Sequence, residues 1–443
     1  MRATVSDCIM SHGEAQRCKE AYKAQGMQVK ALLLLSLLAL AAAQTTPEPE
    51  PESTSSESKN GLVSYILTYS QDMTCEALNT KCKDLNCTTV ICGIVKQLVV
   101  MQDPTGVSAL SIDPALTTAN QNTQVSLDYV ERDVITAANA SLETYPPWHL
   151  DRINQASLPL DGYYASLYTG VGVHIYMIDT GIQTNHSEFL NADSTGSRVV
   201  AGGWAYDGTN NTEDCNGHGT ATASLAAGRT VGTSPNATLH AIRACACDGT
   251  AQVADIIGAL NHVALNAIRP AVISMSVGTP AISLPLQLAV NNTVALYNLS
   301  IIAAAGNDAS DACEATPGRS VYVGSIGATV IDDSIAEYSN IGKCTNCFAP
   351  GSGIYCANLN SGYQKISGTS MACPIVSGVI AQYLQYNSSL TTYDITDTLY
   401  RSRTRGNNFD SVYQRPVPMI QIPTQIDLVL LNQTFVSMYG TYL

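Results

Sequence analysis

Charged side chains are scarce in this 443-residue chain: they make up 13% of it, about half of the ~25% that is typical of soluble domains. Basic residues are the scarcer sign, with 22 Lys and Arg against 36 Asp and Glu, so the formal net charge is −14. Nucleic-acid binding depends on Lys and Arg to neutralise phosphates, so this composition argues against a nucleic-acid partner. The polar surface must come from uncharged side chains, which suits a secreted protein better than a cytosolic one.

The chain also lacks an apolar run that could span a bilayer, for which ~20 residues are needed. Its longest run, Ala31 to Ala43, has thirteen residues, follows Lys30 and ends in small alanines. A basic residue, a short apolar stretch and a small-residue end are typical of a secretory signal peptide. A buried core helix is the alternative, and the strongly polar stretch that follows at once argues against it. We therefore predict a secreted product with no membrane segment.

The first 60 residues are accordingly not expected to form part of a folded domain. Residues 1–43 are predicted to be an N-terminal extension with the signal peptide, and either Met1 or Met27 is the start. Residues 44–60 carry Pro, Glu and Ser without an apolar period, so they cannot bury enough surface to order themselves. We predict a disordered acidic linker there.

Cysteine is plentiful, with 14 residues, but the paired C-x2-C repeats of a strong zinc site are missing. Residues 61–140 predict a small α+β domain: a strand (LVSYILTYS), a Cys-studded helical stretch (CEALNTKCKDLNCTTVICGIVKQLV) and a second strand pair. An exported chain meets an oxidising environment. We therefore favour two local disulfides over zinc for the four cysteines Cys75, Cys82, Cys87 and Cys92.

From Gly170 onward, unbroken apolar strands alternate with helical stretches. The strands are GVHIYMI, ATLHAIRAC, AVISMSV and SIIAAAG, and the helical stretches are GTATASLAAG, VADIIGALNHVAL and LQLAVNNTVALYNL. This pattern predicts an α/β fold, a mostly parallel sheet with helices on both faces. Such folds place their chemistry at the carboxyl ends of the strands, so the residues just after each strand are the candidates for a site.

Three of these segments carry side chains that are typical of hydrolases. Asp179 ends a strand, His218 lies between two glycines at the mouth of a small-residue helix, and Ser370 opens another helix. Each alone also fits a cap or a turn residue. In the order Asp, His, Ser they match one of the three chain orders known for a Ser-His-Asp triad, whereas a lipase-like hydrolase has the order Ser, Asp, His.

The stretches around these residues resemble motifs of the subtilase family of serine proteases, and within it the proteinase K-like branch. The matching stretches are IDTGI (178–182), NGHGT (216–220), SMSVG (274–278), AAAGN (303–307) and SGTSMACP (367–374). The resemblance extends from about Gly61 to about Leu431. It implies an inhibitory propeptide over residues 61–140, here called the propeptide region, then a subtilisin-like catalytic domain over 141–432 and a tail over 433–443.

The resemblance also assigns catalytic roles. Ser370 is the nucleophile, His218 is the general base, and Asp179 orients and stabilises the imidazole. Asn307 is the side-chain donor of the oxyanion hole, and the Ser370 backbone N–H is the second donor.

Two further segments are expected to bind substrate. An edge strand that pairs with the substrate main chain is expected at Ser276, Val277 and Gly278. A wall of the pocket for P1, the residue before the scissile bond, is expected at Ala304, Ala305 and Gly306. Neither segment carries a carboxylate, so we expect broad cleavage after uncharged residues.

The chain departs from the usual family pattern outside the triad. Ala221 and Ile375 stand where the family usually has His, and Thr279 stands where it usually has Gly.

A calcium site common in this branch is also altered. It would use the carbonyls of Val321 and Val323, but Asn346 stands where a carboxylate is usual. Losing that charge weakens the binding of a hard cation. We expect no cofactor, with a structural calcium ion as the one alternative.

The resemblance predicts two disulfides in the catalytic domain, Cys215–Cys247 and Cys313–Cys344. Cys347 and Cys356 are proposed as a third pair because they lie close in the sequence. Cys245 and Cys373 are expected to be buried free thiols.

The propeptide region ends in an extended stretch, VSLDYVERDVITAANA. An inhibitor whose carboxyl end stays in the active-site cleft must present such a strand. We predict self-cleavage between Ala140 and Ser141. Asn139 is a glycosylation acceptor beside that bond, and we expect it to be unmodified.

The sequence thus predicts a secreted, monomeric serine endopeptidase that is made as a zymogen, acts on proteins or peptides and has its own propeptide as inhibitor. The alternative is a self-cleaving binding or regulatory protein that retains its propeptide and cleaves nothing else. Glycosylation is consistent with the Asn-x-Ser/Thr sequences at Asn86, Asn185, Asn210, Asn236, Asn291, Asn298, Asn387 and Asn432.

Overall fold

The computed structural model describes residues 63–102, 115–127, 131–135, 146–191, 193–401, 404–410 and 415–423. All of these belong to one compact unit, residues 57–443. The predicted signal peptide, the linker, the tail, the domain boundaries and the Ala140–Ser141 bond lie outside the described residues. Within the described ranges, no helix combines the length and the apolar character that crossing a membrane requires.

The propeptide region forms an antiparallel sheet with one helix packed against it. Its elements are β1 (Val63–Tyr69), α3 (Cys75–Leu85), β2 (Thr89–Cys92), β3 (Lys96–Gln102) and β4 (Leu116–Gln121), and the strand order is β2-β3-β1-β4. Buried residues of β1, β3 and α3 form a core of their own. The predicted α+β arrangement is present in these residues.

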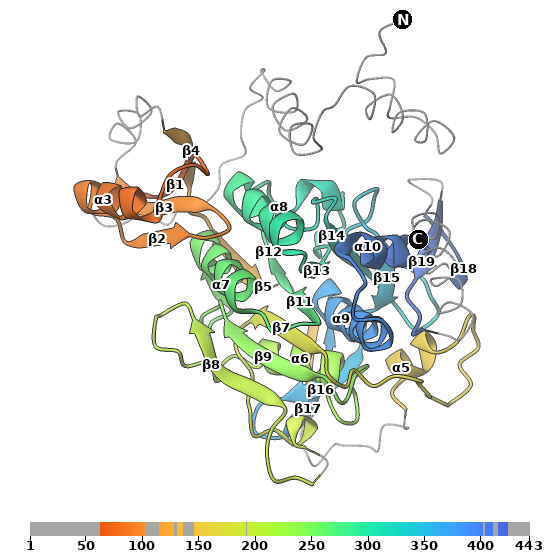
Figure 1. The fold of residues 1–443 in the computed structure, drawn as a ribbon. Helices are drawn as coiled ribbons and strands as arrows, with labels where there is room; N and C mark the ends of the chain where they lie inside the picture. Colours follow the sequence, from red (N-terminus) through yellow and green to blue (C-terminus); the bar gives the residue numbers. More distant parts are fainter. Residues whose placement is uncertain are drawn as a thin grey trace, which may run out of the picture. The chain divides into compact units, whose positions relative to one another are not determined.

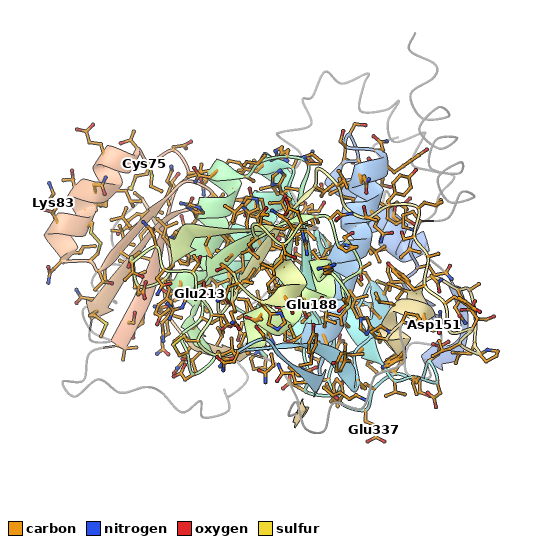
Figure 2. The ribbon with its side chains drawn as sticks, turned by 90° about the horizontal axis from the view of Figure 1, so that it is seen from below. Cys75, Lys83, Asp151, Glu188, Glu213 and Glu337 are labelled. Atoms are coloured by element: carbon orange, nitrogen blue, oxygen red, sulfur yellow. A yellow bond between two sulfur atoms is a disulfide. The ribbon has the colours of Figure 1, made fainter. Side chains whose placement is uncertain are left out.

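The helical stretch of this region is shorter than predicted. α3 begins at Cys75 and carries Lys83 in its last turn (Figure 2). It ends at Leu85 and is capped by Asn86, whose backbone is left-handed, with φ 51°. The residues that follow include β-branched Thr, Val and Ile, which favour strands, so the chain turns back as β2 and β3. Two local disulfides, Cys75–Cys92 and Cys82–Cys87, tie the helix to this turn.

The catalytic region is built on a sheet of nine strands among the described residues (Figure 1). Its strand order is β18-β19-β15-β14-β13-β11-β7-β9-β8. Every neighbouring pair is parallel except β18 with β19. The strands are β7 (His174–Asp179), β8 (Val199–Ala205), β9 (Thr238–Arg243), β11 (Ala271–Met275), β13 (Ser300–Ala304), β14 (Val323–Thr329), β15 (Cys347–Pro350), β18 (Thr404–Asp410) and β19 (Arg415–Met419).

Helices cover both faces of this sheet, as the alternating pattern predicts. α6 (His218–Ala227) and α9 (Thr369–Tyr386) share one hydrophobic core with one face of the strands. α7 (Val253–Asn266) and α8 (Leu284–Tyr297) share a second core with the other face. The remaining helical elements are α5 (Trp148–Ile153), α10 (Thr392–Arg401) and the 3-10 turns η3 (Ser187–Phe189) and η4 (Ala312–Glu314).

Two small antiparallel sheets join the propeptide region to the catalytic region. In the first, β5 (Gln124–Leu127) lies between β10 (Thr250–Gln252) and β12 (Val277–Gly278). In the second, β6 (Glu131–Ile135) pairs with β17 (Gly362–Ser367), which pairs in turn with β16 (Ile354–Asn358).

The catalytic region contains the disulfides Cys215–Cys247 and Cys313–Cys344. The proposed pair of Cys347 with Cys356 is wrong, because Cys347 is a free, buried thiol. The two residues lie on successive strands, and Cys356 Sγ instead donates to the Gln364 carbonyl at 3.7 Å. Proximity in the sequence therefore does not bring the two sulfur atoms together.

Candidate active site

The sheet holds Asp179 at the carboxyl end of β7, between β9 and β11. Its carboxylate is buried, with only 1% of the residue exposed. Oδ1 accepts from the Thr180 backbone N–H at 2.7 Å, and Oδ2 accepts from Thr222 Oγ1 at 3.1 Å. These donors hold the carboxylate at its buried position.

His218, the first residue of α6, contacts that carboxylate directly. Its Nδ1 lies 2.8 Å from Asp179 Oδ1 and 3.0 Å from Oδ2. A carboxylate accepts, so Nδ1 carries the proton and donates. Nε2 is therefore the basic nitrogen of the ring, which is the tautomer that a general base requires.

The turn before His218 is organised by Asp214, a residue that the sequence analysis did not identify. Its Oδ1 accepts from the backbone N–H groups of Asn216 and Gly217, at 2.9 and 3.0 Å. Its Oδ2 accepts from Thr220 through both the backbone N–H, at 2.9 Å, and Oγ1, at 2.6 Å. One buried carboxylate thus fixes the backbone on both sides of the histidine.

The glycines that flank His218 are required by this geometry. Gly217 has φ 103°, a left-handed conformation that side chains other than glycine's disfavour. A Cβ added at Gly219 would lie 2.1 Å from the Gly181 carbonyl oxygen. The backbone after Asp179 and the start of α6 therefore approach as closely as only glycine permits.

Ser370 is the second residue of α9 and is buried. Its Oγ donates to the Ser276 carbonyl at 3.3 Å, and Ser276 Oγ donates to the Ser370 carbonyl at 2.9 Å. The nucleophile candidate is thereby tied to the predicted substrate-binding segment. α9 lies on the same face of the sheet as α6, which carries His218.

Asn307 follows β13 and faces the start of α9. Its Oδ1 accepts from the Thr369 backbone N–H at 2.8 Å, while Thr369 Oγ1 accepts from the Gly306 backbone N–H at 3.2 Å. The first bond fixes which end of the amide is oxygen, so the Nδ2 group is presented as a donor at the other end. The side chain is thus oriented beside the residue that precedes Ser370.

Cys373 lies one turn after Ser370 on α9. Its Sγ donates to the Ile302 and Met275 carbonyls, at 3.4 and 3.6 Å. Burial raises the pKa of this thiol to about 11. The thiol is therefore neutral near pH 7 and cannot serve as an alternative nucleophile.

A segment of the propeptide region occupies the predicted substrate-binding edge. β5 pairs antiparallel with β12, with Leu127 opposite Val277 and Ser126 opposite Gly278. On its other side it pairs with β10, where Val125 is opposite Ala251. β12 was expected from the sequence as a substrate-binding edge strand, whereas the three-residue β10 was not.

The same region also pairs with the strand that precedes Ser370, the nucleophile candidate. In β6, Glu131 lies opposite Ser367 and Ile135 opposite Tyr363. β17 ends at Ser367, and Gly368 leads directly into α9 and Ser370. The chain's own strands therefore pair with β12, which follows Ser276, and with β17, which precedes Ser370.

A pocket opens beside β12, with about 220 Å³ of empty space, open solvent included. Four of the six residues predicted to bind substrate line this pocket. Of the other two, Ser276 is hydrogen-bonded to Ser370 and Val277 pairs with Leu127 of β5. The lining residues are Gly278, Thr279, Pro280, Ala304, Ala305, Gly306, Asp308, Ala315, Thr316 and Gly318. Nine of these ten are uncharged, and Asp308 is the exception.

The departures from the family pattern have local explanations. Ala221 and Ile375 are buried in the core that α6 and α9 share, where their side chains pack against apolar neighbours. Thr279 forms a bridge with Thr316 across the pocket, with N–H to carbonyl bonds of 2.8 and 3.0 Å in the two directions. The hydrogen-bonded bridge holds the two sides of the pocket together.

Asn346, at the predicted calcium position, already accepts a backbone hydrogen bond through its side chain. It is buried, and its Oδ1 accepts from the Ser325 backbone N–H at 2.6 Å. In the described part of the chain, no three His, Cys, Asp or Glu side chains gather as metal ligands. Weak calcium binding stays a prediction.

The sequence model of the subtilase family matches residues 170–415. The chain belongs to the subtilase family. The family domain contains all three triad candidates and Asn307. It begins after the propeptide region, and its extent confirms the family resemblance of the motifs.

Relatives of this subtilase are serine proteases. An extracellular serine proteinase from Thermus sp. (strain Rt41A) is 38% identical over 296 residues, which cover 66% of this chain and 70% of the relative. An alkaline serine exoprotease A from Vibrio alginolyticus is 38% identical over 64% of this chain and 53% of the relative. A cuticle-degrading serine protease from Arthrobotrys oligospora is 35% identical over 63% of this chain and 68% of the relative.

A solved structure supports the fold of this subtilase. The crystal structure of a cold adapted subtilisin-like serine proteinase matches with a TM-score of 0.59 and 37% identity. The match covers 63% of this chain and 98% of that chain. The predicted subtilisin-like α/β fold and the assignment as a serine protease are confirmed.

Proposed function

We propose that this subtilase is a secreted serine endopeptidase that is made as a zymogen. The observation that carries the proposal is the buried contact of His218 Nδ1 with the Asp179 carboxylate, on the face of the sheet where Ser370 opens α9. Secretion is supported by the signal-like stretch in the sequence and by a relative that is named extracellular.

Each side chain has a defined part in the reaction. His218 Nε2 takes the proton from Ser370 Oγ as that oxygen attacks the substrate carbonyl carbon, and the Asp179 carboxylate stabilises the imidazolium that forms. The tetrahedral oxyanion is stabilised by Asn307 Nδ2 and the Ser370 backbone N–H. His218 then gives the proton to the leaving amine, and water repeats the steps on the acyl-enzyme to release the acid.

The zymogen proposal rests on how tightly the propeptide region contacts the catalytic region. Asn261 Oδ1 on α7 accepts from the Ile94 backbone N–H at 3.0 Å, and Asn292 Nδ2 on α8 donates to the Ile94 carbonyl at 2.7 Å. Ile94 and Val95 are fully buried and belong to the core that α7 and α8 share with the sheet. We call Ile94, Asn261 and Asn292 the docking clamp.

A second contact lies immediately before β5, the strand that pairs with the proposed substrate-binding edge β12. The Asn122 side chain accepts from the Ala254 backbone N–H at 3.0 Å, and the Thr123 carbonyl accepts from the Val253 N–H at 3.0 Å. Both donors lie at the start of α7, where N–H groups lack partners within the helix. The propeptide region thus satisfies this helix end immediately before β5 enters the edge.

The pocket supports cleavage after uncharged residues. Its predicted walls, Gly278 and Ala304 to Gly306, are small and present no charged group. A P1 side chain can therefore be buried there largely by apolar contact. Broad specificity follows because strand pairing recognises main chain and not side chains.

The cut between Ala140 and Ser141 stays part of the proposal, as do an unmodified Asn139, a monomeric product and little or no dependence on calcium.

The alternative, a regulatory protein that retains its propeptide, is favoured by one observation: the propeptide region pairs on both sides of Ser370, through β5 and β6. Casein hydrolysis by the secreted protein, with and without a serine-directed inhibitor, separates the two functions. An endopeptidase hydrolyses casein and is blocked by the inhibitor. A protein that is cleaved once, shown by amino-terminal sequencing, but leaves casein intact fits the alternative.

A further inference from the structure

Thr222 is a fully buried hydroxyl that contacts the triad and takes no proton in the proposed reaction. It lies four residues after His218 on α6. Residues four positions apart lie on the same face of a helix, so α6 presents both side chains to Asp179. Thr222 Oγ1 lies 3.1 Å from Asp179 Oδ2, and His218 Nδ1 lies 2.8 Å from Oδ1. One helix thus holds the carboxylate by two of its side chains.

The Thr222 hydroxyl has one hydrogen and two acceptors within reach. Its Oγ1 lies 3.1 Å from Asp179 Oδ2 and also 3.1 Å from the Gly219 carbonyl oxygen. That carbonyl belongs to the first turn of α6, where a carbonyl accepts from the backbone N–H four residues further on. A carboxylate is the stronger acceptor because it is charged, and a buried charge that lacks donors is costly. The hydroxyl therefore donates to Asp179.

The donors around the Asp179 carboxylate are unequally divided between its two oxygens. Oδ1 accepts from the Thr180 N–H at 2.7 Å and from His218 Nδ1 at 2.8 Å. Oδ2 shares the same imidazole N–H at a longer distance, 3.0 Å. In the described part of the chain, Thr222 is the one further donor to Oδ2. Without this hydroxyl, Oδ2 keeps no hydrogen bond of its own, and one oxygen alone fixes the plane of the carboxylate.

The start of α6 lies close against the carboxylate, which keeps the hydroxyl in place. A Cβ built on Gly219 would lie 3.2 Å from Asp179 Oδ1, so the helix backbone reaches the aspartate where a glycine leaves room. Thr222 follows in the next turn. Its branched Cβ leaves it few rotamers in a helix, and its neighbours Ala221 and Ala223 are fully buried. The hydroxyl therefore cannot turn away to water.

We propose that Thr222 is a positioning residue for catalysis: its hydroxyl fixes the Asp179 carboxylate, which in turn holds the His218 ring in the orientation that a general base requires. The inference rests on the proposed protease function and adds a residue to the machinery of that site. The imidazole becomes charged during the reaction and then gives up its proton. A carboxylate that is anchored at both oxygens keeps its orientation through both steps. Thr222 does not line the pocket, so substrate binding does not depend on it.

The expected effect is a loss of rate and not of binding. Replacing the aspartate of a Ser-His-Asp triad by asparagine lowers kcat by ~10⁴ in a protease of another fold. Substitution of Thr222 leaves the charge of Asp179 and its contact with His218 in place, so the loss must be much smaller. We expect kcat to fall about 10-fold in Thr222→Val with KM unchanged, which is the pattern of an interaction that acts in the transition state.

The experiment measures kcat and KM of the processed enzyme on a chromogenic peptide, and a serine-directed inhibitor counts the active sites. Thr222→Val keeps the shape of the side chain and removes the donor, and Thr222→Ala is a second variant without the donor. Thr222→Ser keeps the hydroxyl and removes the methyl group. Thr293→Val is the matched control, because Thr293 is also a buried helical threonine and its Oγ1 donates to the Ala289 carbonyl on α8.

The expected result is a lower kcat per active site with unchanged KM in Thr222→Val and Thr222→Ala, and wild-type values in Thr222→Ser and Thr293→Val. A merely structural role would lower the melting temperature and the number of active sites, but not the kcat of each site. Wild-type kcat in both variants without the hydroxyl overturns the role of Thr222, and so does a loss in Thr222→Ser as large as that in Thr222→Val. The protease function stands in both cases. A wild type that cleaves no peptide overturns both proposals.

Discussion

Gly93 lies next to the docking clamp, and its replacement by alanine tests whether this contact holds the propeptide in place. A Cβ added there would lie 2.0 Å from Asn261 Oδ1 and 3.2 Å from Leu265 Cδ1. Real Cβ atoms do not approach other atoms so closely. Gly93 has no left-handed φ, so alanine fits the backbone and the effect is confined to the contact with α7.

The magnitude follows from the interactions that must open. The clamp contains two hydrogen bonds to Ile94, each worth ~0.5–1.5 kcal/mol. Partial exposure of Ile94 and Val95, now fully buried, adds to this loss. We expect the propeptide to bind more weakly by about 2–3 kcal/mol, which is roughly a 30- to 150-fold higher dissociation constant.

The assay follows hydrolysis of a chromogenic peptide after the secreted, self-cleaved complex is diluted. Gly93→Ala is expected to shorten the lag before full activity. Asn292→Ala is a second variant that leaves the propeptide sequence unchanged and removes one bond of the clamp. Gly203→Ala is the control, because a Cβ there meets nothing closer than 3.6 Å.

If both variants are processed normally and their lag equals that of the wild type, the clamp does not retain the propeptide. A shortened lag in Gly203→Ala would show that the assay reports general destabilisation.

Three further predictions concern catalysis and stability. Asn307→Ala is expected to lower kcat by about 10²–10³, the loss found for this donor in subtilisin, a member of the same family. The fold should be retained, with a small loss of stability because the Thr369 N–H loses its acceptor; an unchanged kcat would remove Asn307 from the oxyanion hole. Replacing Cys215 and Cys247 by alanine opens a loop with a sequence separation of 32 and is expected to lower the free energy of unfolding by about 3–4 kcal/mol, measured by urea unfolding of the Ser370→Ala protein. Burial lowers the pKa of His149 from 6.5 to about 4, so the unfolded chain binds a proton below about pH 6.5 that the folded chain takes up only below about 4. The free energy of unfolding should therefore fall by up to about 3 kcal/mol as the pH drops through this window, and His149→Gln should flatten that dependence.

The triad candidates were predictable because each belongs to a local pattern. Asp179 ends a buried strand, His218 lies between glycines, and Ser370 opens a helix. Each pattern needs only neighbours in the sequence, and the parallel sheet then brings the strand ends to one edge.

Asp214 and β10 were not predictable in this way. Asp214 acts through Thr180 and Thr220, and only the folded turn brings these residues to it. β10 has three residues and becomes a strand because β5 pairs with it. Neither feature has a period or a composition that marks it in the sequence.

The prediction of P1 specificity was limited for a similar reason. It considered the two wall segments of the pocket alone, and both are uncharged as expected. Asp308 belongs to neither segment and enters the pocket through the loop that Asn340 holds. The incorrect prediction of a Cys347–Cys356 disulfide likewise rested on the assumption that residues close in the sequence are close in space.

The most direct test of the account is the Ser370→Ala substitution in the full chain, expressed in a protease-deficient host. In the proposed mechanism Ser370 Oγ attacks the substrate, and the side chain's bond to the Ser276 carbonyl is long, at 3.3 Å, so the substitution should leave the fold intact. The account predicts that the variant is secreted uncleaved and that casein hydrolysis is abolished. Processing at the wild-type position together with wild-type casein hydrolysis would contradict it.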